Sequence, residues 1–166
     1  MIRVVGQARC AGAVVESDPW LELKISWLPR PADQPLYLRL SGSGGGQVEL
    51  KFEGETGRLL QAVIIDTPPL LDLDKEERPI AQPDMSVPVV DLSIWGSKEN
   101  ADVSTPARSI VEMVADLSYS KSERIKVLRL SEAEVSDYCG CQNAWVGVSR
   151  HGELATIAAL DVSHGA

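Results

Sequence analysis

Three cysteines, Cys10, Cys139 and Cys141, are the first side chains in this sequence that could do chemistry. A structural zinc site takes four cysteine or histidine ligands, usually in two spaced pairs, and only His151 and His164 could complete one here. Because that ligand set is incomplete, we expect no bound metal and no cofactor. Three is also an odd number without the spacing of a disulfide framework. We therefore expect all three cysteines to be reduced, with Cys139 and Cys141 partly buried in a strand or turn.

The two histidines offer little for acid–base catalysis. His151 lies in a predicted hairpin turn, His164 lies near the end of the chain, and neither is close to a nucleophile motif such as G-x-S-x-G. The glycine-rich residues 41–46 lack the lysine and the helix of a phosphate-binding loop. The sequence thus predicts no enzymatic activity. A remaining alternative is an active site assembled only in three dimensions, from Asp66, Asp91 and His151.

Carboxylates gather in the middle of the chain. Residues 66–102 carry nine acidic and three basic residues, a net charge of −6 out of −8 for the whole chain. The alternating acids of this segment lack the glycine and the final glutamate of a calcium loop. Leucines between them suit a protein interface better than a metal cage. We predict that the segment binds a partner through its acidic side chains, namely Asp72, Asp74, Glu76, Glu77, Asp84 and Asp91.

Four tryptophans suggest an alternative function, a small-ligand or carbohydrate-binding β-domain with an aromatic pocket. These are Trp20, Trp27, Trp95 and Trp145. Core packing explains Trp27 and Trp145 equally well, because both lie in segments of alternating hydrophobicity.

The elements that must position these residues are mainly β-strands. Residues 36–66 read as three short strands joined by glycine-bearing turns, an antiparallel meander. A looser copy follows at residues 127–161, and the tetrapeptide LRLS opens both copies. We predict a mainly β fold in which two three-strand meanders pack as a sandwich or form one curved sheet. A β-rich α+β fold is the alternative.

The rest of the chain divides at prolines and glycines. A strand broken near Gly6 or Gly12 is followed by an alternating strand over residues 20–28. Five prolines make residues 66–88 a long loop or extended arm. The remaining predicted elements are a strand at residues 89–95, a hairpin beginning at 109–117 with helix as its alternative, and a closing hairpin formed by 143–148 and 154–160.

At 166 residues, the length fits a single domain. We divide it into an N-terminal β half (1–66), an acidic, proline-rich loop and strand (67–106) and a C-terminal β half (107–166). The N-terminal sequence resembles no secretory signal, and no apolar run approaches the roughly 20 residues that span a bilayer. With the cysteines taken as reduced, we expect a cytoplasmic protein.

Three segments carry a resemblance to a known family: residues 48–66, 116–131 and 143–161. They resemble small acidic, β-rich bacterial immunity proteins, which are encoded beside polymorphic or contact-dependent toxins. The resemblance implies a cytosolic, non-catalytic inhibitor that binds and neutralises a cognate toxin. Toxin nucleases are often basic because they bind nucleic acid, so an acidic inhibitor could cover that surface. An acidic chain is not expected to bind nucleic acid or an anionic membrane itself.

Overall fold

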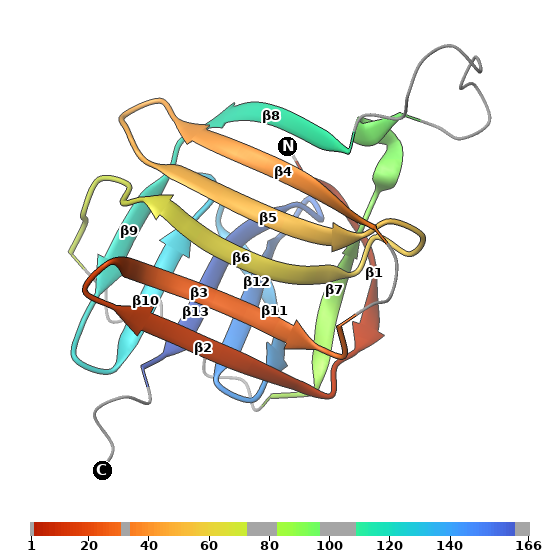
Figure 1. The fold of residues 1–166 in the computed structure, drawn as a ribbon, viewed down its shortest axis with the longest axis horizontal. Coiled ribbons are helices and arrows are strands. Elements are labelled where there is room, and N and C mark those ends of the chain that lie inside the picture. Colours follow the sequence, from red (N-terminus) through yellow and green to blue (C-terminus); the bar gives the residue numbers. More distant parts are fainter. Residues whose placement is uncertain (1, 31–33, 73–82, 97–108, 162–166) are drawn as a thin grey trace.

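The computed structural model describes residues 2–30, 34–72, 83–96 and 109–161. Their strands form three sheets, and two of these face each other as the layers of a sandwich (Figure 1). The prediction of a mainly β fold is confirmed. The described part contains no helix that is long and apolar enough to cross a membrane.

The first layer is a six-stranded sheet in the order β2-β3-β6-β5-β4-β8. Strand β5, in the interior of this sheet, alternates half-buried and buried residues at every position. The predicted meander of residues 36–66 is confirmed, because β4, β5 and β6 are sequential antiparallel neighbours. The strand bounds are β2 Gly12–Asp18, β3 Leu21–Leu28, β4 Pro35–Gly42, β5 Gln47–Glu53, β6 Leu59–Asp66 and β8 Ile110–Ala115.

The second layer is a five-stranded sheet in the order β11-β12-β13-β10-β9. The closing hairpin is confirmed as β12 and β13, and with β11 they form the second antiparallel three-strand meander, which begins at Val135 rather than at the LRLS segment where the prediction started it. Residues 127–161 hold four strands in a Greek-key order, in which β10 lies beside β13 rather than β11. The bounds are β9 Ser118–Lys121, β10 Ile125–Arg129, β11 Val135–Cys141, β12 Ala144–Ser149 and β13 Leu154–Leu160.

The segment over residues 109–117 forms a strand, as predicted, but not in a hairpin. Strand β8 pairs in parallel with β4 at the edge of the six-stranded sheet. The hairpin is made by the next two strands, β9 and β10. A strand with alternating exposure suits an edge position, and its partner is set by the whole sheet rather than by the next turn.

A two-stranded sheet closes one side of the sandwich (Figure 1). Strands β1 (Val4–Arg9) and β7 (Ser86–Val90) pair antiparallel. The predicted break in the first strand lies between Gly6 and Gly12, where β1 ends and β2 begins. The predicted strand at residues 89–95 is wrong over most of its length, because β7 ends at Val90 and a short 3₁₀ helix, η2 (Leu92–Trp95), follows. Pro88 lies inside β7, whose one partner strand in the described part of the chain is β1, although an isolated bridge also joins Val89 to Arg58.

The layers share one large apolar core. Side chains from the six-stranded sheet, such as Trp27 and Phe52, belong to the same cluster as Leu128 and Ile157 from the five-stranded sheet. A second, smaller cluster forms on strands β10, β12 and β13, with Tyr138 of β11 packed against it. Its fully buried members are Ile125, Val127, Trp145 and Ala158.

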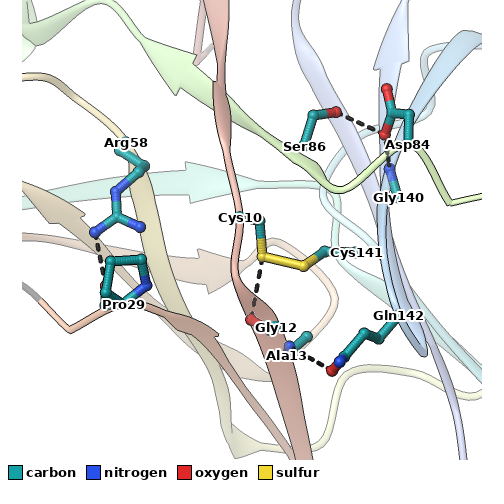
Figure 2. Close-up of a disulfide and its surroundings, with 10 residues drawn as sticks. All are labelled: Cys10, Gly12, Ala13, Pro29, Arg58, Asp84, Ser86, Gly140, Cys141 and Gln142. Carbon is teal, nitrogen blue, oxygen red and sulfur yellow. Dashed lines mark hydrogen bonds between the residues drawn. A yellow bond between two sulfur atoms is a disulfide. The ribbon is translucent and has the colours of Figure 1, made fainter.

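The prediction of three reduced cysteines is wrong. Cys10, at the break between β1 and β2, forms a disulfide with Cys141, the last residue of β11, across 131 positions of sequence (Figure 2). Cys139 is a free, buried thiol. The pairing escaped the sequence analysis because it depends on which strands meet, and spacing along the chain does not carry that information.

The ends of the proline-rich segment are ordered rather than loop-like. Tyr119 N donates to Pro69 O at 2.9 Å and Leu71 N donates to Tyr119 O at 2.8 Å, so residues 69–71 run beside β9. Pro68 is buried, and its Cα lies 2.5 Å from where a Cβ on Gly46 would be. Gly46 also has a φ of +90°, so this close approach is open to glycine only.

Candidate functional site

The structure places the predicted acidic partner-binding residues in different surroundings. Asp72 is exposed at the end of the segment that runs beside β9. Asp84 and Asp91 each accept hydrogen bonds within the protein. The other three, Asp74, Glu76 and Glu77, lie outside the described residues. Whether the six bind a partner stays a prediction.

Asp84 holds the edge of the five-stranded sheet. Its Oδ1 accepts a hydrogen bond from Gly140 N at 2.9 Å and another from Ser86 Oγ at 2.7 Å (Figure 2). Burial by itself would raise the pKa of Asp84, but these hydrogen bonds outweigh it and the pKa is lowered. The carboxylate therefore accepts a hydrogen bond from a backbone N–H of β11 that would otherwise be unpaired at the edge of the sheet.

Asp91 caps the short helix η2. Its Oδ1 accepts a hydrogen bond from Ser93 N at 2.9 Å, which satisfies one of the free N–H groups of the first turn. The hydrogen bonds from Ser93 lower the pKa of Asp91, and the positive charge of Arg3 adds to the effect.

The alternative active site of Asp66, Asp91 and His151 does not assemble. Asp66 pairs with Gln47 at the start of β5, whereas Asp91 lies near Gly57, in the turn at the other end of that strand. Within the described residues, no group of three or more histidine, cysteine, aspartate or glutamate side chains could hold a metal ion.

The four tryptophans do not share a pocket. Trp27 and Trp95 belong to the main core, where Trp95 stacks edge-on against Phe52 at a centroid distance of 5.4 Å. Trp145 belongs to the second apolar cluster. Trp20 is 96% exposed at the turn between β2 and β3. An aromatic pocket built from all four is therefore not formed.

The exposed Trp20 sits on a turn with little freedom. Asp18 Oδ1 accepts hydrogen bonds from Trp20 N at 2.7 Å and from Leu21 N at 2.8 Å. An aspartate that bonds the backbone two and three residues ahead fixes a tight turn. The backbone of Trp20 is therefore held although its ring touches solvent on nearly every side.

The strand that follows Trp20 is clamped to the opposite sheet through Glu22. Its Oε1 accepts hydrogen bonds from Tyr119 Oη at 3.0 Å and Lys121 Nζ at 3.1 Å, and its backbone oxygen accepts one from Lys126 Nζ at 2.9 Å. Burial alone would raise the pKa of Glu22, but the hydrogen bonds from Lys121 and Tyr119 outweigh it and the pKa is lowered. Burial, with the negative charge of Glu22, raises the pKa of Tyr119.

Other exposed apolar side chains surround the same end of the sandwich. Leu70 and Leu71, 61% and 49% exposed, run beside the backbone of Tyr119, whose hydroxyl donates to Glu22. Ile65, 57% exposed, lies two positions beyond Val63, which pairs with Lys24 at the end of the β3–β6 ladder. We define the Trp20 surface as the exposed residues at this end, namely Asp18, Trp20, Ile65, Asp66, Leu70, Leu71 and Asp72.

The sequence analysis placed Asp72 and the leucines beside it in a predicted binding segment, but it missed the part of the surface around Trp20. It assigned Trp20 to the start of the strand of residues 20–28 and considered its ring only as part of an aromatic pocket. A signal was present in Ser17-Asp18-Pro19, a turn that ends directly before Trp20. Neither the protein-family models nor the curated proteins with which the sequence was compared contain a match.

Proposed function

We propose that this protein is a non-catalytic inhibitor that binds and neutralises a basic toxin domain, and that the toxin docks on the Trp20 surface. The observation that carries the proposal is a tryptophan 96% exposed to solvent on a turn held by Asp18. When a partner covers a large apolar ring, apolar surface is removed from water and the free energy of the system falls. Exposed aliphatic neighbours and carboxylates extend the same surface around the ring.

Trp20 suits tight binding because its backbone is already ordered in the free protein. Tryptophan is enriched among the few interface residues that carry most of the binding free energy. The hydrogen bonds of Asp18 hold the turn, and those of Glu22 hold the strand behind it. Little conformational entropy is therefore lost when a partner closes over the ring, which favours affinity.

The charge of the surface defines the chemistry of the partner. Asp18, Asp66 and Asp72 are exposed around the apolar residues, and the chain carries a net charge of −8. Such a surface attracts a basic partner and raises its association rate. A nuclease toxin has the complementary charge because it binds a phosphate backbone.

The compartment in which the two proteins meet remains open to experiment. A cytoplasmic location was predicted from reduced cysteines, and the disulfide between Cys10 and Cys141 removes that basis. Disulfides persist mainly in oxidising compartments such as the periplasm. Thiol alkylation of the protein in intact cells, followed by mass measurement, distinguishes the oxidised form from the reduced form.

The test is binding to the purified toxin domain encoded beside the gene. We expect Trp20→Ala to weaken binding by about 2 kcal/mol or more, roughly 30-fold, mainly through faster dissociation. Val114→Ala is the matched control, since Val114 is 75% exposed on the edge strand β8. If the wild-type protein does not bind the toxin, the proposed function is wrong. If Trp20→Ala binds as tightly as the control, the docking surface is elsewhere.

A second variant tests the acidic segment. Replacing Asp72, Asp74, Glu76 and Glu77 by their amides removes four negative charges and keeps the side-chain shapes. We expect the association rate to fall about tenfold at low salt if these charges steer the toxin. The difference should shrink toward 1 M salt, where the Debye length is about 3 Å. An association rate equal to that of the wild type at both salt concentrations would show that the acids only solubilise the chain.

A further inference from the structure

A concavity of about 220 Å³ lies against the outer face of the six-stranded sheet, on the side away from the core. Three cationic side chains line it, from three different segments: Lys24 of β3, Arg30 just after β3 and Lys51 of β5. The neutral polar side chains of Ser26 and Gln61 line it as well. A group of cations around one hollow is unexpected in a chain with a net charge of −8.

The strand register makes the hollow a single site. Ser26 of β3 pairs with Gln61 of β6, and Gln61 pairs with Lys51 of β5. Neighbouring strands lie about 4.8 Å apart, so β3 and β5 are separated by about 10 Å, with β6 between them. Lysine side chains have flexible four-carbon stems, and those of Lys24 and Lys51 can therefore reach one small anion placed over Gln61.

The charges of the hollow are only partly compensated. Lys24 forms an ion pair with Glu16 at 3.3 Å, in which both side chains are well exposed. Lys51 Nζ lies 5.6 Å from the centroid of the Tyr37 ring, and within the described residues neither Lys51 nor Arg30 forms an ion pair. Two of the three positive charges thus have no carboxylate partner in the described part of the chain.

The base of the hollow is polar and ordered. Ser26 is only 3% exposed, and its Oγ accepts a hydrogen bond from Gln61 Nε2 at 3.1 Å. Because the hydroxyl oxygen is the acceptor in that bond, the hydroxyl hydrogen of Ser26 remains able to donate to an anion.

The segment that carries Arg30 is anchored by a buried arginine. Arg58 is 7% exposed, and its Nη2 donates to Pro29 O at 2.7 Å (Figure 2). Its Nε donates to Glu53 at 3.4 Å, which holds the guanidinium from the other side. Arg58 is thus a positioning residue that fixes the chain directly before Arg30.

We propose that this hollow is a binding site for a small oxyanion, with Lys24, Arg30 and Lys51 supplying the charge and Ser26 a hydrogen bond. The guanidinium of arginine matches the paired oxygens of phosphate and carboxylate groups, and lysine contributes point charge. The volume is below the about 300–1,000 Å³ of pockets for drug-sized ligands, so the ligand is a small molecule. This proposal concerns a different site from the Trp20 surface and does not depend on the proposed function.

The experiment is a titration of the full-length protein with inorganic phosphate, followed by the backbone amide signals in NMR spectra at constant ionic strength. We expect saturable shifts centred on the amides of Lys24, Arg30, Lys51 and Gln61. Acetate, titrated in the same way, distinguishes the class of ligand, because saturation by phosphate alone identifies a phosphate site and saturation by acetate identifies a carboxylate site. Shifts that increase linearly with both anions, without saturation, would overturn the proposal.

Two variants and a control complete the test. Lys51→Gln and Arg30→Gln should each raise the apparent Kd about tenfold, in line with the loss of one charged hydrogen bond. Arg150→Gln is the matched control, since Arg150 is an exposed arginine in the turn between β12 and β13. The spectrum of each variant without anion shows whether it is folded. A folded Lys51→Gln or Arg30→Gln variant that binds as tightly as the control would also overturn the proposal.

Discussion

The two sheets place the leucines of the same tetrapeptide, LRLS, in one core, but their outer faces differ. In β4, Leu38 and Leu40 face the core, while the Arg39 side chain between them is 42% exposed and pairs with Glu49 at 2.9 Å. In the second copy Leu128 and Leu130 face the same core and Arg129 is half-buried, but Val127, directly before the tetrapeptide, lies on the opposite face of β10 and is only 2% exposed. The outer face of the six-stranded sheet is therefore charged, and that of the five-stranded sheet is apolar.

The difference shows why one layer was easier to predict than the other. A sheet with one face in water alternates apolar and polar residues, whereas strands buried on both faces read as continuous apolar runs. Strand β13 is close to such a run, because its six consecutive buried residues, Leu154 to Ala159, include only one polar side chain, Thr156. The core side of the five-stranded sheet resembles that of its partner, so the contrast lies in what covers the outer face.

The largest expected effect comes from placing the same charge on the two outer faces. Val127→Lys puts an unpaired ammonium group into the second apolar cluster, and we expect a loss of about 3–5 kcal/mol in the free energy of unfolding. Val114→Lys on β8 places the group where the valine is 75% exposed, and we expect a change within about 0.5 kcal/mol. Urea unfolding of both variants measures the difference. Equal losses would show that the outer faces do not differ in burial.

The next largest effect concerns the disulfide that joins Cys10, before β2, to Cys141 at the end of β11. The double variant Cys10→Ala/Cys141→Ala should lose about 2–4 kcal/mol, because the disulfide closes a long loop in the unfolded chain. Unfolding with and without reductant measures this loss, and reduced wild-type protein should match the double variant.

Cys139→Ala is the control for that measurement. Burial raises the pKa of the Cys139 thiol, so little thiolate forms to exchange with the disulfide. The Cys139→Ala protein should therefore respond to reductant as the wild type does. If it alone resists reductant, Cys139 takes part in disulfide exchange.

The capped edge of the five-stranded sheet gives a smaller, pH-dependent effect. Asp84→Asn should lower stability by about 1 kcal/mol at neutral pH, since it weakens the hydrogen bonds from Gly140 and Ser86. The folded-state pKa of Asp84 is lowered, so its contribution is present above the unfolded pKa of about 3.9 and is lost as the pH falls through the folded pKa.

Unfolding midpoints in urea between neutral and acidic pH test this. The difference between wild type and Asp84→Asn should shrink below about pH 4. Asp137→Asn, on an exposed position of the same edge strand, is the control and should change stability by less than about 0.5 kcal/mol. A constant difference across that range would mean that the charge of Asp84 is not involved.

The smallest effect is expected on the charged outer face itself. Arg39 and Glu49 form a cross-strand ion pair with 42% and 21% of their side chains exposed. A double-mutant cycle with Arg39→Gln and Glu49→Gln should give a coupling below about 1 kcal/mol, which declines as salt is added. A coupling that is larger and insensitive to salt would show that this face is more buried than the comparison implies.

The sequence by itself determined the strands whose partners are their neighbours along the chain. The meander of β4, β5 and β6 and the hairpin of β12 and β13 follow from two-residue alternation and short glycine-bearing turns. Both signals are local, because neither the alternation nor the turns require information from distant parts of the sequence. They also located most of the main core, because alternation assigns each residue of such a strand to one face.

Only the tertiary structure decided the pairings between distant segments. Strand β8 joins β4 in parallel, β10 joins β13, and Cys10 meets Cys141 across 131 positions. These contacts minimise the free energy of the whole fold, and no residue pattern inside a single strand specifies its distant partner. The same holds for the burial of Trp20 and Trp145, two tryptophans that both stand near the start of a strand-like segment of the sequence. One is exposed on a turn and the other is buried between strands, because burial depends on what the rest of the chain places around each ring.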